Sequence, residues 1–181
     1  QPYTDYDIVY GGNGKPASES WYNNGTLWQT ETFNADGSVH DMHRWGITGQ
    51  AWTDTDIVYG AGGKEASQTW WNNGQLYQDA TWAADGARHL TRYSGGVATY
   101  EAWNRGDGTY ARQLYENVTG QSYTAFEYDY DAAGHMLLTD QTNSNGTHLL
   151  IGRQANMTIT STAADDTING NGSGVTFVFA G

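Results

Sequence analysis

Tryptophan and carboxylate side chains gather in the first 45 residues, and both types can act on sugars. Trp21, Trp28 and Trp45 offer large flat rings that can stack on the apolar faces of pyranose rings. Glu19 and His43 lie beside them in the sequence and can take hydrogen bonds from sugar hydroxyls. We therefore predict a sugar-binding aromatic row here. The alternative is that these indoles line up across strands as a hydrophobic core.

A second group of carboxylates alternates along a β-prone segment, Thr124 to Asp131. Glu127, Asp129 and Asp131 fall on one face, while Phe126, Tyr128 and Tyr130 fall on the other. Alternate residues of a strand lie roughly 6.5–7 Å apart. That spacing suits hard oxygen ligands for Ca²⁺ and also the carboxyl pair of a glycosidase. A solvated strand face that discourages edge pairing is the third interpretation.

These residues lie within a segment that the chain repeats. Thr4–Gly11 returns as Thr53–Gly60, an offset of 53 − 4 = 49 residues, and the offset continues without a gap as far as His40 and His89. A period of this length indicates a repeated supersecondary unit. The second copy holds Trp70 and Tyr77 where the first holds Trp21 and Trp28. It replaces the two glutamates Glu19 and Glu31 by Gln68 and Ala80.

Tight turns fix the predicted strand pairing within each copy. Asn24-Gly25 is the preferred pair for a two-residue type I′ turn, because both positions need positive φ. That turn pairs Tyr22 with Leu27, Trp21 with Trp28 and Glu19 with Thr30. Asp36-Gly37, treated by the same rule, pairs Phe33 with His40, Thr30 with His43 and Trp28 with Trp45. The three indoles then form one row, about 5 Å apart from strand to strand.

The composition agrees with an all-β chain. Gly accounts for 24 of 181 residues and aromatic residues for 14%, which is typical of many short strands joined by turns. We predict an antiparallel hairpin-repeat meander that closes as a sandwich or barrel. Residues 1–155 would form this domain from two copies and a degenerate third, and residues 156–181 would pack on it as a short β tail.

The charge and the residue types that are missing restrict the partners. The formal net charge is −12, from 20 acidic residues against 8 basic ones, so nucleic acid is not an expected partner. No stretch has the apolar length needed to span a bilayer, so we expect no membrane partner. The chain has no cysteine, which fits the cytosol as well as secretion routes without an oxidising folding compartment.

The last residues carry an apolar period of nine. Ile159, Ile168 and Phe177 stand nine apart, and Asp166 opens the segment Asp166–Gly172. This tail resembles the RTX (haemolysin-type) calcium-binding repeat, with Asn169 and Asn171 among the glycines and Met157 and Val175 in place of loop aspartates. The resemblance implies Ca²⁺ near Asp166, a structural role for the ion, and type I export from a bacterium. The segment Tyr130–His135 also resembles the core of YD (Rhs-type) repeats, which build β-shells.

Taken together, the residues favour a non-catalytic carbohydrate-binding module. It would be covalently linked to the catalytic domain of a larger secreted, polysaccharide-degrading bacterial enzyme. Its ligand-binding residues would be Trp21, Trp28, Trp45, Glu19 and His43, with Trp70 and Tyr77 as a second subsite. Structural Ca²⁺ would use the three aspartates Asp166, Asp129 and Asp131.

Two other functions fit the same sequence. The first is a small glycan-active hydrolase or lyase that uses Glu19, Glu31 or Glu127 as its carboxylates. The second is a structural spacer or adhesin segment of a type I secreted protein, with no small ligand. Binding to soluble glycans and release of reducing ends separate the three functions.

Overall fold

The fold consists almost entirely of β-strands, as the sequence predicts. The computed structural model describes residues 3–161 and 166–179. Its only helix in these ranges is the single 3₁₀ turn η1 (Ala61–Gly63). No helix among the described residues is long and apolar enough to cross a membrane. The chain divides into two compact units, Gln1–Ala83 and Ala84–Gly181, each of which is considered by itself.

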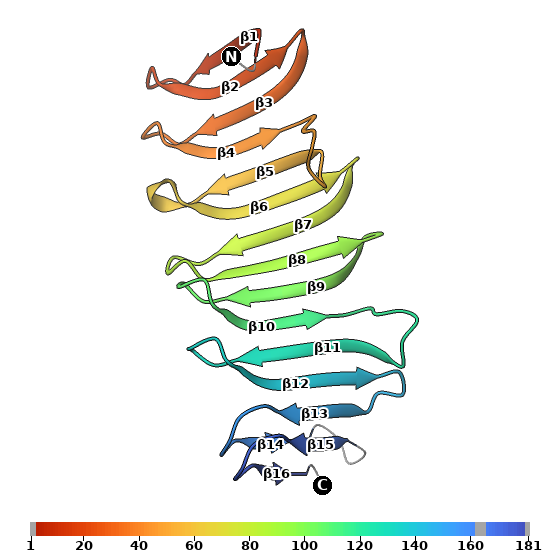
Figure 1. Ribbon diagram of the computed structural model, residues 1–181. Helices are drawn as coiled ribbons and strands as arrows, with labels where there is room; N and C mark the ends of the chain where they lie inside the picture. The colour runs from red at the N-terminus through yellow and green to blue at the C-terminus, as the bar shows by residue number, and fades with distance from the viewer. Residues whose placement is uncertain (1–2, 162–165, 180–181) are drawn as a thin grey trace. The chain divides into compact units, whose positions relative to one another are not determined.

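The first unit is a meander of seven antiparallel strands that lie side by side in sequence order (Figure 1). The strands are β1 (Asp5–Tyr10), β2 (Pro16–Asn23), β3 (Thr26–Phe33), β4 (Val39–Arg44), β5 (Asp54–Tyr59), β6 (Glu65–Asn72) and β7 (Gln75–Trp82). Each of β2 to β6 pairs with the strand before it and the strand after it. Sequence neighbours are therefore neighbours in the sheet.

The predicted closure into a sandwich or barrel is wrong. Within the first unit the described strands form one layer, and β1 does not pair with β7. No second layer buries the side chains on either face of the sheet, so most of them stay partly exposed. In β6 the six residues between its ends all have intermediate exposure. The fully buried apolar residues of this unit are Met42, Ile57 and Ala80, on three different strands. Turn residues specify which strands pair, but not whether a second layer covers them.

The 49-residue repeat reappears as repeated geometry. Thr4 Oγ1 accepts a hydrogen bond from the backbone N–H of Asn24 at 2.9 Å, and Thr53 Oγ1 accepts one from Asn73 N–H at the same distance. The strands that follow these threonines, β1 and β5, pair with partners that carry the same bulge, in which Ala17 of β2 and Ala66 of β6 are extra residues. The two copies are thus duplicated in structure as well as in sequence.

The two kinds of turn differ from each other. Asn24 and Gly25 have φ of 48° and 76°, and Asn73 and Gly74 have 50° and 78°, as a type I′ turn requires. At Asp36-Gly37 only the glycine has positive φ. There Asn34 N–H donates to Ser38 O, and Gly37 N–H donates to Asn34 O, which describes a type I turn followed by a bulge. The predicted type I′ turn at Asp36-Gly37 is therefore wrong, and Phe33 pairs with Val39 rather than with His40.

The second unit continues with antiparallel strands and ends with parallel ones. Strands β8 (Arg88–Ser94), β9 (Val97–Asn104), β10 (Tyr110–Tyr115), β11 (Tyr123–Tyr130), β12 (Met136–Asn143) and β13 (His148–Gly152) pair in sequence order. Strand β15 (Thr167–Gly170) pairs with β13 in parallel. Strands β14 (Thr158–Thr160) and β16 (Thr176–Val178) form a separate parallel pair.

The tail strands pack closely against the end of the antiparallel sheet. Ile159 of β14 is 2% exposed, and a Cβ atom added to Gly152 of β13 would lie 2.5 Å from Ile159 Cδ1. This position therefore needs a glycine for reasons of space. Along the chain, strands β13 and β15 of one sheet alternate with strands β14 and β16 of the other. Each turn of this coiled tail therefore contains two strands, one in each sheet, and Leu150 and Ile159 are buried.

Candidate functional site

The predicted tryptophan row does not form, because each copy contains a bulge at the tryptophans. Tyr22 pairs with Leu27 as predicted, but Trp21 then pairs with Gln29 and leaves Trp28 as the extra residue of the bulge. Trp28 lies next to Trp45 on the neighbouring strand, where Trp45 N–H donates to Trp28 O at 2.9 Å. The predicted pairing of Trp21 with Trp28, and with it the pairing of Glu19 with Thr30, is wrong.

The strand register assigns the predicted ligand-binding residues to both faces of the first unit. Directly paired residues share a face. Trp21 pairs with Gln29, Gln29 with Arg44, Arg44 with Thr55 and Thr55 with Trp70. Glu19 lies on this same face, which we call the Trp21 face. His43 pairs with Thr30 and Asp56 on the opposite face, together with Trp45, and we call this the His43 face. Tyr77 is the bulge residue of the second copy.

None of the eight tryptophans forms a hydrophobic core. All eight have intermediate exposure, so each indole is partly covered and partly open to solvent. The core interpretation of these residues requires buried rings. Half-covered rings are what a one-layer sheet produces on both of its faces.

A stack of three rings occupies the His43 face. The His43 ring lies 4.0 Å from Trp45 and 5.6 Å from Trp71, nearly parallel to both. Its Nδ1 is 3.7 Å from a carboxylate oxygen of Asp56. Burial, followed by the negative charge of Asp41, raises the pKa of Asp56. A sugar ring between two aromatic rings needs about 7–8 Å between their planes, so no sugar fits inside this stack.

Two glutamates lie directly opposite each other on the Trp21 face. Glu19 of β2 pairs with Glu31 of β3. Gln29 donates to Glu31 Oε1 at 2.8 Å, and Arg44 donates to Gln29 Oε1 at 2.6 Å. Burial, followed by the charge of Glu19, raises the pKa of Glu31. Two carboxyls held close together, one of them with a raised pKa, are the starting point for acid–base catalysis.

The second unit collects most of its smaller aromatic rings on one face. We call this the tyrosine face, and its rings lie on β9, β10 and β11. The rings touch in pairs, with centroids 4.9 Å apart for Tyr100 with Tyr115 and for Phe126 with Tyr128, and 6.3 Å apart for Tyr115 with Tyr128. The complete set is Tyr100, Tyr110, Tyr115, Tyr123, Phe126, Tyr128 and Tyr130.

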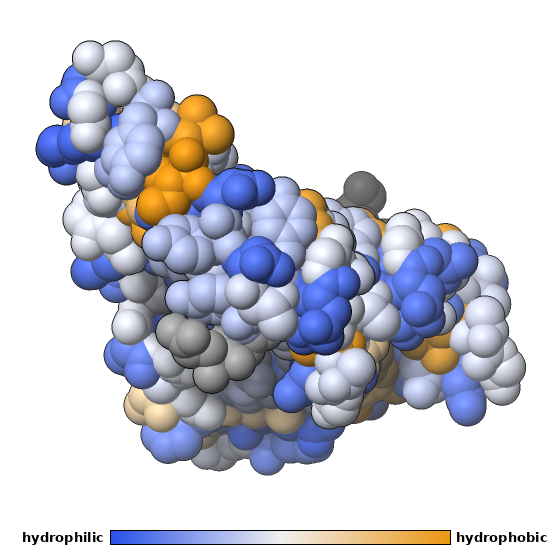
Figure 2. Space-filling view, turned by 90° about the horizontal axis from the view of Figure 1, so that it is seen from above, coloured by the Kyte–Doolittle hydropathy of each residue, from blue (hydrophilic) through white to orange (hydrophobic). Residues whose placement is uncertain are grey.

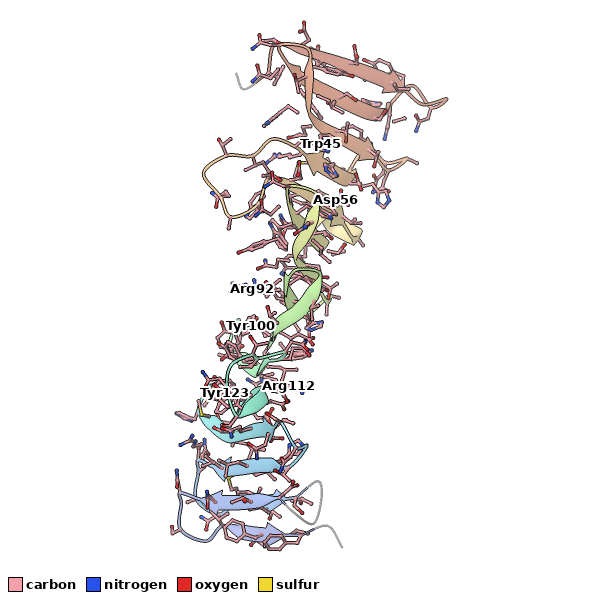
Figure 3. The ribbon with its side chains drawn as sticks, turned by 90° about the vertical axis from the view of Figure 1, so that its right-hand side faces the viewer. Trp45, Asp56, Arg92, Tyr100, Arg112 and Tyr123 are labelled. Carbon is pink, nitrogen blue, oxygen red and sulfur yellow. The ribbon has the colours of Figure 1, made fainter. Side chains whose placement is uncertain are left out.

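Polar groups are interspersed among these rings. Gln113 donates to the Tyr100 hydroxyl at 2.7 Å and accepts from the Tyr130 hydroxyl at 2.6 Å, which fixes the two phenols. The Arg92 guanidinium lies 5.3 Å from the centre of the Tyr100 ring. Tyr110 is 39% exposed and Tyr115 41% exposed. Figure 3 labels Arg92, Tyr100 and Tyr123 of this face, and Arg112 of the opposite face.

A polar hollow lies where the tyrosine face ends. It has a volume of about 400 Å³ and is lined by Ser122, Asn143, Ser144 and Asn145. Asn143 pairs with Tyr123, so the hollow adjoins the last ring of the face. Hydroxyl and amide groups at the end of an aromatic surface can orient a ligand that the rings bind by contact.

The opposite face of the second unit is acidic. Glu101, Glu127, Asp129 and Asp140 share it with the cationic side chain of Arg112, which forms an ion pair with Glu127. Trp103 lies here between the His89 ring, 4.5 Å away, and the Arg112 guanidinium, 4.7 Å away. Burial raises the pKa of Asp129. The predicted split of β11 into an aromatic and an acidic face is confirmed for its strand residues.

The predicted calcium ligands lie apart. Asp129 belongs to the acidic face, whereas Asp131 follows β11 and caps the turn to β12, accepting from Ala133 N–H and His135 N–H at 2.9 Å each. Those turn hydrogen bonds lower the pKa of Asp131 to about 2. Asp166 is buried and accepts from His148 N–H at 2.9 Å. In residues 3–161 and 166–179 no group of three or more His, Asp or Glu side chains could hold a metal ion. Calcium binding remains a prediction.

The comparisons with known proteins give no family. No protein-family model matches this chain, and no curated protein matches it significantly in sequence.

Sequence reasoning detected part of the tyrosine face and missed its extent. The alternation of Phe126, Tyr128 and Tyr130 along β11 is visible in the sequence. Tyr100 and Tyr115 join them only through the pairing of β9, β10 and β11. The Asp107-Gly108 turn between β9 and β10 was the signal that could have located them.

Proposed function

We propose that this chain is a non-catalytic carbohydrate-binding module whose ligand is a polysaccharide bound along the tyrosine face. Aromatic rings at successive strand positions can stack on successive sugar rings, while phenol hydroxyls, Gln113 and the polar hollow hydrogen-bond to sugar hydroxyls. Trp45 and Trp71, at the outside of the His43 stack, are a second place for a sugar to bind.

One observation supports this proposal above the others. A continuous set of aromatic rings lies on a sheet face that no other described strand of its unit covers, and its rings include the exposed Tyr110 and Tyr115. A continuous, partly exposed aromatic surface of this kind is a mark of a binding site. The polar atoms among the rings favour a hydroxylated ligand over an apolar one.

Isothermal titration with soluble glucans, xylan, mannan and alginate tests the proposal. We expect one of these glycans to bind, and we expect Tyr115→Ala to weaken its binding about 5- to 150-fold, because one stacked ring contributes roughly 1–3 kcal/mol. The matched control is Tyr10→Ala, which removes an exposed tyrosine of β1 in the first unit. Binding that is absent, or equally weakened by both variants, would contradict the proposal.

A specific observation also supports a second candidate, a glycan-active hydrolase. The paired carboxyls Glu19 and Glu31 lie beside Trp21, and the pKa of Glu31 is raised. Residues directly opposite in antiparallel strands have Cβ atoms about 4.5–5.5 Å apart, which suits the carboxyl separation of a retaining glycosidase.

Release of reducing ends from the same glycans decides between the two candidates. Activity that Glu31→Gln abolishes, and that Glu65→Gln on the exposed start of β6 preserves, would favour the hydrolase. We expect no activity from the wild-type chain, because the two carboxyls lie on an open sheet face rather than in a cleft that excludes water.

The setting of the module is part of the same proposal. We propose that it belongs to a secreted bacterial enzyme and is exported by the type I system, with Ca²⁺ bound in its tail. The parallel strands β13, β15, β14 and β16, with two strands per coil, support a relation to calcium-binding repeats. Melting with and without a chelator tests the ion: a lower Tm with chelator supports it, and an unchanged Tm removes it.

A further inference from the structure

The free edge of β1 has the properties of an inner strand. β1 pairs with β2 on one side, and no described strand of its unit pairs with its other side. Tyr6 is 56% exposed, Val9 60% and Tyr10 63%. Figure 2 looks from above onto the end of the sheet where Figure 1 places β1, and hydrophobic side chains reach the surface there among hydrophilic ones.

The internal repeat identifies the kind of strand that fits this edge. Thr4–Gly11 and Thr53–Gly60 differ at one position, Tyr6 against Thr55. β5 uses the edge that is free in β1 to pair with β4. In that pairing Ile57 lies opposite Met42, and Asp56 lies opposite His43, with 3.7 Å between a carboxylate oxygen and His43 Nδ1. Ile57 is 7% exposed as a result.

β1 also lacks lysine and proline, two residue types that protect many edge strands. Natural edges carry lysine, proline or inward-pointing charges that prevent further pairing. β1 has neither lysine nor proline, and its Asp5 and Asp7 are matched by Asp54 and Asp56 in the inner strand β5. Because an inner strand carries the same two aspartates, Asp5 and Asp7 are not a sign that β1 is adapted to an edge position.

We propose that the free edge of β1 binds an additional antiparallel strand with the chemistry of β4, supplied by a further repeat of this type. The incoming strand places an apolar residue opposite Ile8, a histidine opposite Asp7 and a polar residue opposite Val9, as Met42, His43 and Asp41 do for β5. The inference is independent of the proposed function, because it concerns the first unit and not the tyrosine face.

Hydrogen exchange of the full chain, with a synthetic peptide of residues 26–45 as the probe, tests this interaction. The peptide carries β3 and β4 as a hairpin and presents the β4 edge. At ten times the Kd we expect about tenfold slower exchange of β1 amides that face the free edge, since exchange then requires dissociation. Residues of β6 and β7, which lie far from β1 in the sheet order, serve as internal controls.

Variants of the peptide and of β1 test whether the peptide pairs with the free edge of β1. The peptide with Met42→Pro and His43→Pro cannot pair as a strand, and we expect it to slow no β1 amide. In the protein, Ile8→Lys should abolish the effect, and Glu19 opposite it can pair with the new charge so that the sheet still folds. Tyr6→Thr makes the strand match β5, and we expect the peptide to bind it at least as tightly as the wild type.

Two results would overturn the proposal. One is unchanged exchange of β1 amides in the wild type and in Tyr6→Thr at millimolar peptide. The other is a dimer in sedimentation whose β1 amides are already slow without peptide, because the edge would then bind a second copy of β1.

Discussion

Glu31 is a carboxyl that the sheet brings against a second carboxyl, Glu19, on the neighbouring strand. Burial raises its pKa above the usual value of 4.5, and Glu19 adds to the effect, whereas Arg44 and Gln29 oppose it. The folded protein thus holds the Glu31 proton more tightly than the unfolded chain does. Stability from this group is present at low pH and falls as pH rises from about 4.5 through the folded pKa.

The Glu31→Gln substitution removes this dependence. We expect the variant to melt at a higher temperature than the wild type at pH 7.5, because the buried charge and its repulsion from Glu19 are absent. Near pH 4, where the wild-type carboxyl is protonated, the two melting temperatures should converge. Melting curves followed by circular dichroism between pH 4 and 8 measure the difference, and a variant that is less stable at pH 7.5 would contradict the assignment.

Gly25 is a residue whose backbone conformation only glycine adopts cheaply. Its φ is 76°, in the second position of the type I′ turn. Gly25→Ala should lower the free energy of unfolding by roughly 1–2 kcal/mol, the cost of the left-handed region for other residues. Gly12→Ala is the matched control, since Gly12 does not have positive φ and a Cβ there meets nothing within 4 Å. Equal effects of the two substitutions in urea unfolding would rule out this turn geometry.

At the scale of elements, the strand β13 depends on Gly152 for its contact with β14. An added Cβ would lie 2.5 Å from Ile159 Cδ1 and 2.8 Å from the Met157 sulfur. We expect Gly152→Ala to destabilise the second unit by about 1–3 kcal/mol through overpacking.

A double substitution separates overpacking from a general loss of structure. Ile159→Ala removes the nearer of the two groups that the new Cβ would meet, so Gly152→Ala should cost less in that background than in the wild type. Urea unfolding of the two single variants and the double variant gives the coupling. Additive costs would mean that the tail strand does not pack on β13 as described.

In the hairpins, the turns could be predicted from the sequence but the bulges could not. Asn24-Gly25 and Asn73-Gly74 were predictable because a type I′ turn demands positive φ at both positions, and few residue pairs supply it. The bulges beside Trp21 and Trp70 were not, since an extra residue leaves no mark in a pattern of alternating side chains. One bulge was enough to separate Trp21 from Trp45 and to replace the predicted row by the His43 stack.

At the scale of the molecule, the sequence predicted the antiparallel meander but not its open state. Turn residues act between neighbouring strands, whereas closure depends on what covers the sheet faces. In these strands aromatic residues occur on both faces, as Trp70 and Trp71 illustrate on β6. Such a pattern permits either a covered sheet or a single layer that exposes half of each ring.

Because no second layer covers it, the tyrosine face is available to a ligand, and the proposed function depends on this access. On the opposite face of the same strands, the ring of Trp103 is stacked between His89 and Arg112. The two faces therefore differ in which rings a large ligand can reach, and the difference can be measured on one sample.

Covalent footprinting of aromatic side chains by mass spectrometry, with and without the glycan that binds, measures this difference in access between the two faces. We expect Tyr110 and Tyr115 to react readily in the free chain and to be protected by the glycan, while the reactivity of Trp103 is unchanged. Tyrosines that are unreactive in the free chain, or protection that falls on Trp103 and spares Tyr115, would contradict this expectation.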